Sequence, residues 1–217
     1  GAFVFEVNYG MDVLNSGNYT TLYSEHLHYH TLKALNNFLQ KENLFIFHAE
    51  KVSGQGGNIR VFVKHKDDHV SDIIKKNYKL NADKYFQLLE DEKYIDEKII
   101  QFKQIIEKQK KDINELLNSI KEENKSIAIF GAPAKLTTMF SYLELDPKQF
   151  KYVVEENNLK IGKFTPQFHI PIVDLEYMKN NPVDYMFIGA WNFANSIIEK
   201  TNFDGKWIAP MPELKVI

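Results

Sequence analysis

The stretch Ile127-Ala-Ile-Phe130, followed by Gly131-Ala-Pro-Ala-Lys135 and the segment 136–143, decides the fold of the C-terminal part of the chain. An apolar run predicts a buried strand, the run with Gly and Pro predicts a tight turn, and the next segment predicts a helix. The same alternation continues, with strands expected at residues 152–154, 185–188 and 207–209 and helices at 175–179 and 193–200. Such alternation is typical of a parallel sheet covered by helices, so we expect a small parallel α/β domain.

Upstream of this stretch, residues 67–125 are rich in Lys and Glu and contain neither Gly nor Pro. Their apolar residues keep steps of three, four or seven, the spacing of one helix face: Ile95, Ile99, Phe102, Ile106, Ile113, Leu116 and Ile120. The pattern predicts a long helical connector with a solvated outer face. A coiled-coil site for a partner helix is the less favoured interpretation.

The N-terminal part is predicted to form a strand at residues 2–7, a helix at 31–40 and a strand at 44–52. One face of the helix is expected to carry Leu32, Leu35, Phe38 and Leu39. The turn-rich run 53–57 joins the strand at 44–52 to an alternating strand near residues 59–63. We therefore expect these two strands to be antiparallel neighbours. The chain begins with Gly1 inside a predicted strand and without Met, as expected for a piece of a longer protein or for a residue left by tag removal.

Composition narrows the classes of partner. The 217 residues carry Lys+Arg 27 and Asp+Glu 29, a formal net charge of −2, so neither nucleic acid nor a membrane surface is the expected partner. The sequence contains no cysteine, so the chain has no disulfide, no thiolate nucleophile and no cysteine zinc site. The absence of cysteine suits a reducing, cytoplasmic location. The longest apolar runs are far shorter than the roughly 18 residues of a membrane span.

A dense group of reactive side chains lies in Tyr23-Ser-Glu-His-Leu-His-Tyr-His30. Imidazole and carboxylate groups can be tuned to titrate near neutral pH, so Glu25 and His26 suit removal of a proton next to a carbonyl. Tyr23 could hydrogen-bond the enolate oxygen that results. A structural histidine near a helix N-terminus explains the pattern equally well.

The alternating His26, His28 and His30 also permit a metal site, because a strand would place all three imidazoles on one face. We regard this as the minor interpretation and expect no metal here, since no further ligand follows at a familiar helical spacing.

Gly131-Ala-Pro-Ala-Lys135 lies where a strand meets a helix N-terminus, a position that can bind phosphate. It matches neither a Walker loop nor the GxGxxG pattern. A simple tight turn and an anion site are therefore equally compatible with it.

Seven short motifs follow one another along the chain: Phe5-Glu-Val-Asn-Tyr9, Tyr23-Ser-Glu-His26, Gly56-Gly-Asn-Ile-Arg60, Gly131-Ala-Pro-Ala-Lys135, Lys160-Ile-Gly-Lys-Phe-Thr-Pro166, His169-Ile-Pro-Ile172 and Ala190-Trp-Asn-Phe193. In this order they resemble the C-terminal half of the sugar C-methyltransferases, which act on nucleotide-linked deoxysugars. The resemblance covers nearly the whole chain apart from the Lys-rich helical segment.

The resemblance implies an α/β fold in three parts: the tail of a class I methyltransferase sheet at residues 1–66, a helical connector at 67–125, and a Rossmann-like domain associated with the sugar nucleotide at 126–217. It implies S-adenosylmethionine as cofactor of the full-length enzyme and zinc only in an N-terminal domain without counterpart here. Because the earlier strands supply most of the cofactor site, we expect this chain alone to bind S-adenosylmethionine poorly.

The resemblance also implies roles for individual residues. His26 would remove the sugar C3 proton acidified by a C4 ketone, Glu25 would orient or assist it, and Tyr23 would stabilise the oxyanion. Ser24 replaces a histidine of the family pattern, and Leu136 replaces a glycine after Lys135. The candidate substrate contacts are Lys135, Arg60, Lys160, Lys163 and Asn192.

The alternative for Arg60, Lys160 and Lys163 is the role of ordinary surface cations. We expect Trp191 and Phe193 to be core residues. The sequence thus favours the C-terminal portion of a C-methyltransferase with a nucleotide-linked sugar as substrate. The rival hypothesis is a non-catalytic sugar-nucleotide-binding or scaffolding module that lacks the cofactor site.

Unpaired strand edges would also permit a homo-oligomer formed by strand exchange.

Overall fold

The computed structural model describes residues 1–52, 57–70, 72–78 and 82–217. The chain forms two compact units, one of residues 1–17 and 25–103 and the other of residues 18–24 and 104–217. The predicted turn at 53–57 lies outside the described residues except for Gly57. The units do not follow chain order strictly, because seven residues of the N-terminal part belong to the second unit.

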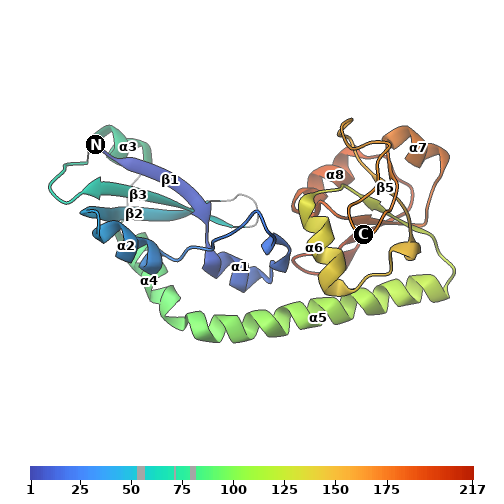
Figure 1. Cartoon of the computed structure of the whole chain (residues 1–217), viewed down its shortest axis with the longest axis horizontal. Coiled ribbons are helices and arrows are strands. Elements are labelled where there is room, and N and C mark those ends of the chain that lie inside the picture. The colour runs from blue at the N-terminus through green and yellow to red at the C-terminus, as the bar shows by residue number, and fades with distance from the viewer. Residues whose placement is uncertain (53–56, 71, 79–81) are drawn as a thin grey trace. The chain divides into compact units, whose positions relative to one another are not determined.

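The first unit is built on a three-stranded sheet. It contains β1 (Phe3–Asn8), α1 (Gly10–Ser16), α2 (Leu32–Gln40), β2 (Leu44–Val52), β3 (Asn58–His65), α3 (Asp72–Tyr78), α4 (Ala82–Asp91), a 3-10 turn η2 (Glu92–Tyr94) and the start of α5 (Ile95–Glu122). The strand order is β1-β3-β2 and both pairs are antiparallel, which confirms the predicted pairing of the last two strands. Helices α2 and α4 lie on one face of this sheet (Figure 1).

The core of the first unit lies between that sheet face and these helices. Ile59, Val61 and Val63 point into it from β3, because alternate residues of a strand share a face. Helix α2 contributes Leu32, Leu35 and Leu39, as predicted, whereas Phe38 is 65% exposed and its expected place on the buried face was wrong. Burial of each such leucine stabilises the fold by about 1.5–3 kcal/mol.

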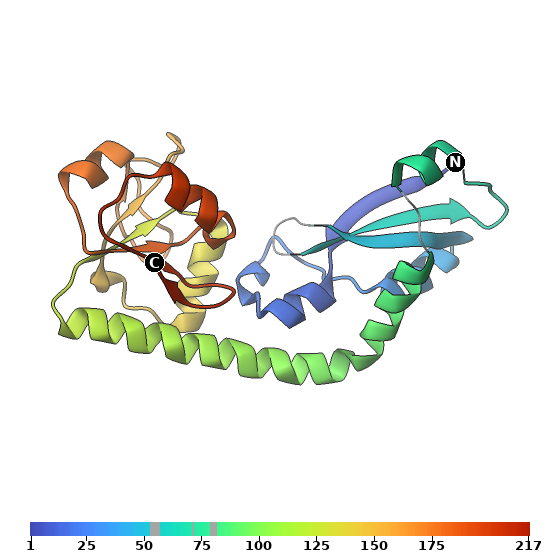
Figure 2. The same ribbon diagram turned by 180° about the vertical axis from the view of Figure 1, so that it is seen from behind.

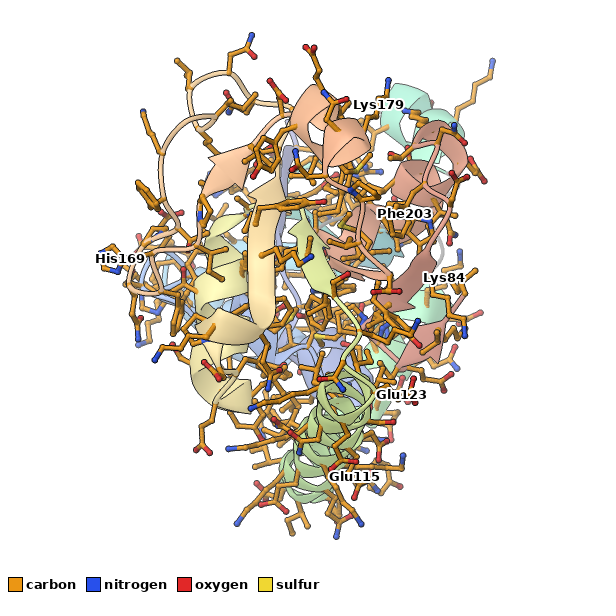
Figure 3. All side chains as sticks on the ribbon, turned by 90° about the vertical axis from the view of Figure 1, so that its right-hand side faces the viewer. Lys84, Glu115, Glu123, His169, Lys179 and Phe203 are labelled. Atoms are coloured by element: carbon orange, nitrogen blue, oxygen red, sulfur yellow. The ribbon has the colours of Figure 1, made fainter. Side chains whose placement is uncertain are left out.

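The predicted connector is helical but interrupted. It is divided into α3, α4 and α5, and η2 separates the last two. In the second part of α5, Ile113, Leu117 and Ile120 are buried at steps of four and three. Glu115 lies on the exposed face of the same helix (Figure 3). The solvated outer face expected from the sequence is therefore present.

The second unit is a parallel-rich α/β sheet with helices. It contains a 3-10 turn η1 (Tyr19–Thr21), the rest of α5, β4 (Ile127–Phe130), α6 (Ala134–Leu143), η3 (Pro147–Gln149), β5 (Phe150–Val154), β6 (Ile172–Val173), α7 (Leu175–Asn180), β7 (Tyr185–Ile188), η4 (Trp191–Phe193), α8 (Ala194–Lys200), β8 (Lys206–Ala209) and β9 (Lys215–Val216). The strand order is β6-β5-β4-β7-β8-β9, and every pair is parallel except β8 with β9. The predicted α/β class is confirmed.

Helices cover the second sheet, and α7 and α8 share one of its faces (Figure 2). Ala128 and Phe130 of β4 point toward that face and pack with side chains of α7 and α8. The strand order reverses at β4, because β5 lies on one side of it and β7 on the other. In open α/β sheets, ligands bind outside the carboxyl ends of the strands at such a reversal. Within the described part of the chain, no helix has the length and apolar character needed to cross a membrane.

Candidate functional site

The segment predicted to carry acid and base groups is a loop between η1 and α2. Glu25 is exposed, whereas Tyr23 and His26 are half-buried. Tyr23 belongs to the second unit, and Glu25 and His26 belong to the first. The loop therefore crosses from one compact unit to the other between Ser24 and Glu25.

The imidazole of His26 is held at the carboxyl end of β1. The side-chain amide nitrogen of Asn8, the last residue of that strand, lies 3.4 Å from His26 Nδ1. The ring of Tyr29 lies edge-on to the imidazole, with 6.4 Å between the ring centres. Sequence reasoning missed Asn8, although it is part of the quoted motif Phe5-Glu-Val-Asn-Tyr9.

The other end of the loop is tied to the same strand. The Gly10 amide donates to the His30 carbonyl at 2.8 Å, and the His30 amide donates to the Asn8 carbonyl at 3.3 Å. Burial lowers the pKa of His30, and the neighbouring His28 lowers it further. His30 therefore favours the neutral imidazole.

The structure does not provide the strand that the alternative metal site needs. Residues 22–29 form neither helix nor strand, and His30 makes only an isolated bridge with Tyr9. The imidazoles of His26, His28 and His30 therefore do not share a strand face. Among the described residues, no group of three or more His, Asp or Glu side chains is arranged to hold a metal ion.

In the second unit, two predicted substrate residues contact each other across 57 positions of sequence. Lys135, in the first turn of α6, donates to the side-chain oxygen of Asn192 at 2.7 Å. Its ammonium also lies 5.2 Å from the centre of the Trp191 ring, and the indole of Trp191 donates to the Thr20 hydroxyl at 3.2 Å. Burial lowers the pKa of Lys135. The result is a half-buried cation held beside the carboxyl ends of β4 and β7.

Lys160 is bound to the turn that follows β4. Its ammonium donates to the Ala132 carbonyl at 2.9 Å and to Glu155 at 3.1 Å, and the Ala132 amide donates to the same carboxylate. Burial opposes ionisation of Glu155, but hydrogen bonds from Lys160 and from backbone amides outweigh it and lower the pKa. Gly131 is required in this turn, since φ is +86° and an added Cβ would lie 2.7 Å from Ala190.

The two remaining predicted cations have different environments. Arg60, on β3 of the first unit, pairs with Glu6 of β1 at 2.6 Å and with Glu50 of β2 at 3.1 Å. These cross-strand ion pairs fit the alternative of a structural surface cation. Lys163 is exposed in the loop before β6, and Figure 3 shows His169 of the same loop at the rim of the unit.

A crevice of about 410 Å3 lies at the carboxyl ends of β4, β5 and β7. Its walls include Gly131, Glu155, Lys179 and Phe193. Phe193 is 66% exposed, so its predicted place in the core was wrong: it belongs to η4, which follows the end of β7 and contains no buried residue. Trp191 is half-buried and also lies outside the core. Lys179 of α7 is visible at the crest of the unit (Figure 3).

Two comparisons with known proteins bear on the family of this chain. Residues 53–212 match the model of the C-methyltransferase C-terminal domain. The chain is also similar to "C-methyltransferase NovU" of Streptomyces niveus, with 28% identity over 223 residues. That alignment covers 100% of this chain and 51% of the relative, so the chain spans about half of the relative's length. With most of its residues inside the family match, the chain belongs to the C-methyltransferase C-terminal domain family.

Proposed function

We propose that this chain is the C-terminal portion of an S-adenosylmethionine-dependent C-methyltransferase that methylates a nucleotide-linked 4-keto-deoxysugar at C3. The observation that carries the proposal is the family match over residues 53–212. The anchored loop around His26 and the half-buried cation Lys135 supply the chemistry that this reaction needs. The scaffolding alternative is retained as an outcome of the test below.

His26 is the proposed base. A C4 ketone acidifies the C3 hydrogen, and removal of that proton leaves an enolate whose charge lies mainly on oxygen. For Nε2 to accept the proton, Nδ1 must carry its own hydrogen. The Asn8 side chain, 3.4 Å away, would accept that hydrogen after rotation of its amide exchanged oxygen and nitrogen. Glu25 would assist the base, and the Tyr23 hydroxyl would donate to the enolate oxygen.

S-adenosylmethionine supplies the methyl group from its sulfonium when it is bound to the whole protein. The described strands of the first unit pair only in antiparallel fashion. Glycine-rich nucleotide cradles are built at the ends of parallel strands. The residues present therefore do not form a complete site for this cofactor, and we assign none of them to it.

Lys135 is the proposed contact of the sugar-nucleotide diphosphate. Its ammonium is already oriented by Asn192 and partly shielded from water, which strengthens its attraction for a phosphate. Lys160 and Lys163 lie in the segment that follows the carboxyl end of β5, and we propose them as weaker contacts of the diphosphate. The exposed ring of Phe193 in the crevice wall offers a surface on which a nucleobase could stack.

The test measures binding and proton removal separately. We expect calorimetric titration to show binding of a thymidine diphosphate 4-keto sugar and little binding of S-adenosylmethionine. Exchange of the C3 hydrogen in deuterium oxide, followed by NMR, should then fall at least about 100-fold in His26→Asn, as expected for loss of a general base. His65→Asn, an exposed histidine of the same unit, is the matched control. Binding of neither compound would favour a scaffolding module, and unchanged exchange in His26→Asn would exclude this base.

A further inference from the structure

A buried carboxylate lies where the helical connector meets the first sheet. Glu92, the first residue of η2, is only 5% exposed. It accepts hydrogen bonds from the Tyr9 hydroxyl at 3.0 Å, from the Leu32 amide at 2.5 Å and from the Lys33 amide at 2.8 Å. All four residues belong to the first unit.

The two amides are the first donors of α2, which have no partner within the helix. The side chain of the helix's own cap, Thr31, accepts from the Ala34 amide, at 3.2 Å. Glu92 therefore completes the cap from 60 positions away in sequence. Its negative charge also interacts favourably with the positive end of the helix dipole. Hydrogen bonds to an ionised group are stronger than those between neutral groups, so this contact is a firm attachment.

Two of the three donors adjoin the end of the loop that carries His26, and the third lies beside the strand residue that contacts the imidazole. Leu32 begins α2 directly after the loop, and Tyr9 directly follows Asn8, the residue in contact with the imidazole. Burial raises the pKa of Tyr9, and the charge and hydrogen bond of Glu92 raise it further. The Tyr9 hydroxyl thus remains a donor to Glu92 at every physiological pH.

We infer that Glu92 is a positioning residue for the proposed base: it holds the start of α2 and the end of β1 at a fixed separation, and so fixes the imidazole of His26 against Asn8. This inference rests on the proposed function for its catalytic meaning, but not for its geometry. Glu92 touches neither the imidazole nor a reacting atom. Its effect is transmitted through the backbone of α2, which follows the loop, and through the backbone at the end of β1, whose last residue contacts the imidazole.

Glu92→Gln is the decisive variant, because an amide keeps the size of the side chain but offers only one acceptor oxygen for three donors. Glu90→Gln is the matched control: Glu90 is exposed, two residues away, and pairs only on the surface with Lys93 at 2.6 Å. We expect amide hydrogen exchange at Leu32 and Lys33 to become about tenfold faster in Glu92→Gln and to stay unchanged in Glu90→Gln.

The readout specific to positioning is the imidazole of His26. In Glu92→Gln we expect its carbon-bound proton NMR signals to shift and broaden, while those of His65, at the far end of β3, stay in place. At saturating sugar nucleotide, C3 hydrogen exchange should fall about tenfold with little change in Kd. If Glu92→Gln does not fold, Tyr9→Phe removes one of the three donors without adding an unmatched group, and the same shifts are expected.

The outcomes separate the inference from the proposed function. Faster amide exchange with unchanged His26 signals would show that Glu92 only caps α2, and would overturn the inference. Altered His26 signals in Glu92→Gln, together with normal C3 exchange in His26→Asn, would support the positioning effect while rejecting His26 as the base.

Discussion

Replacing Lys135 by Met should weaken binding of the nucleotide sugar strongly and change the stability of the fold little. In the free protein the ammonium makes one hydrogen bond, to Asn192, and lies over the Trp191 ring. Each of these contributes about 1 kcal/mol, and the burial that lowers the pKa of Lys135 offsets much of that sum. We therefore expect the free energy of unfolding of Lys135→Met to differ from that of the unmodified protein by less than about 1 kcal/mol.

Binding of the nucleotide sugar should suffer far more. A hydrogen bond between a cation and an ionised acceptor contributes about 1.5–3 kcal/mol. Because 1.4 kcal/mol corresponds to a factor of ten, Kd should rise about 10- to 100-fold in Lys135→Met. Only the protonated ammonium attracts phosphate, so the affinity of the unmodified protein should fall as pH rises through the lowered pKa of Lys135, before an ordinary lysine would lose its charge.

Calorimetric titration with a thymidine diphosphate sugar at pH 7 measures this effect, with urea unfolding as the companion experiment. The control is Lys148→Met. Lys148 lies in η3 at the amino ends of the parallel strands, whereas Lys135 lies at their carboxyl ends. An equal loss of affinity in the two variants would show a general charge effect and refute the assignment. Unchanged affinity in Lys135→Met would refute it as well.

Two further predictions concern the stability of the second unit. Asp184 accepts from the Ser126 amide and hydroxyl, both at 2.7 Å, and these bonds lower its pKa to about 2. Because the pKa is lowered, the ionised carboxylate stabilises the fold at pH values above its ordinary pKa of 3.8, and this stabilisation is lost as pH falls through about 2. Asp184→Asn should therefore lower the free energy of unfolding, measured in urea, by about 1 kcal/mol at pH 7 and by progressively less below pH 4. Leu143 is fully buried at the end of α6, and Leu143→Ala should lower the free energy of unfolding by about 2–5 kcal/mol, whereas a loss below 1 kcal/mol would contradict its place in the core.

The sequence determined the order and type of most elements in the second unit. Strands β4, β5, β7 and β8 and helices α6, α7 and α8 all lie where apolar runs and turn residues predicted them. Such patterns depend on neighbours within a few residues, so they can be recognised without knowledge of the fold. The two-residue strands β6 and β9 were missed because so short a segment has no measurable period.

Exposure at the end of an element could not be predicted in the same way. Phe38 lies at helical spacing from buried leucines of α2, and Phe193 begins a segment predicted to be a helix, yet both are exposed. Whether an apolar side chain is covered depends on which other element lies over it. Only the packed structure supplies that information.

The candidate functional site shows the same contrast between what local sequence predicts and what tertiary packing decides. The sequence supplied His26, Glu25 and Tyr23 as a local cluster, because they are neighbours in the chain. It gave no sign that Asn8 contacts His26, that Lys135 meets Asn192, or that Glu92, within a segment rich in charged residues, is a buried cap for α2. Those contacts join positions 18, 57 and 59 residues apart, and hydrogen bonds of this kind form only after strands and helices have packed together. Local periodicity therefore specified the elements of this protein, whereas tertiary packing decided which of its polar side chains act together.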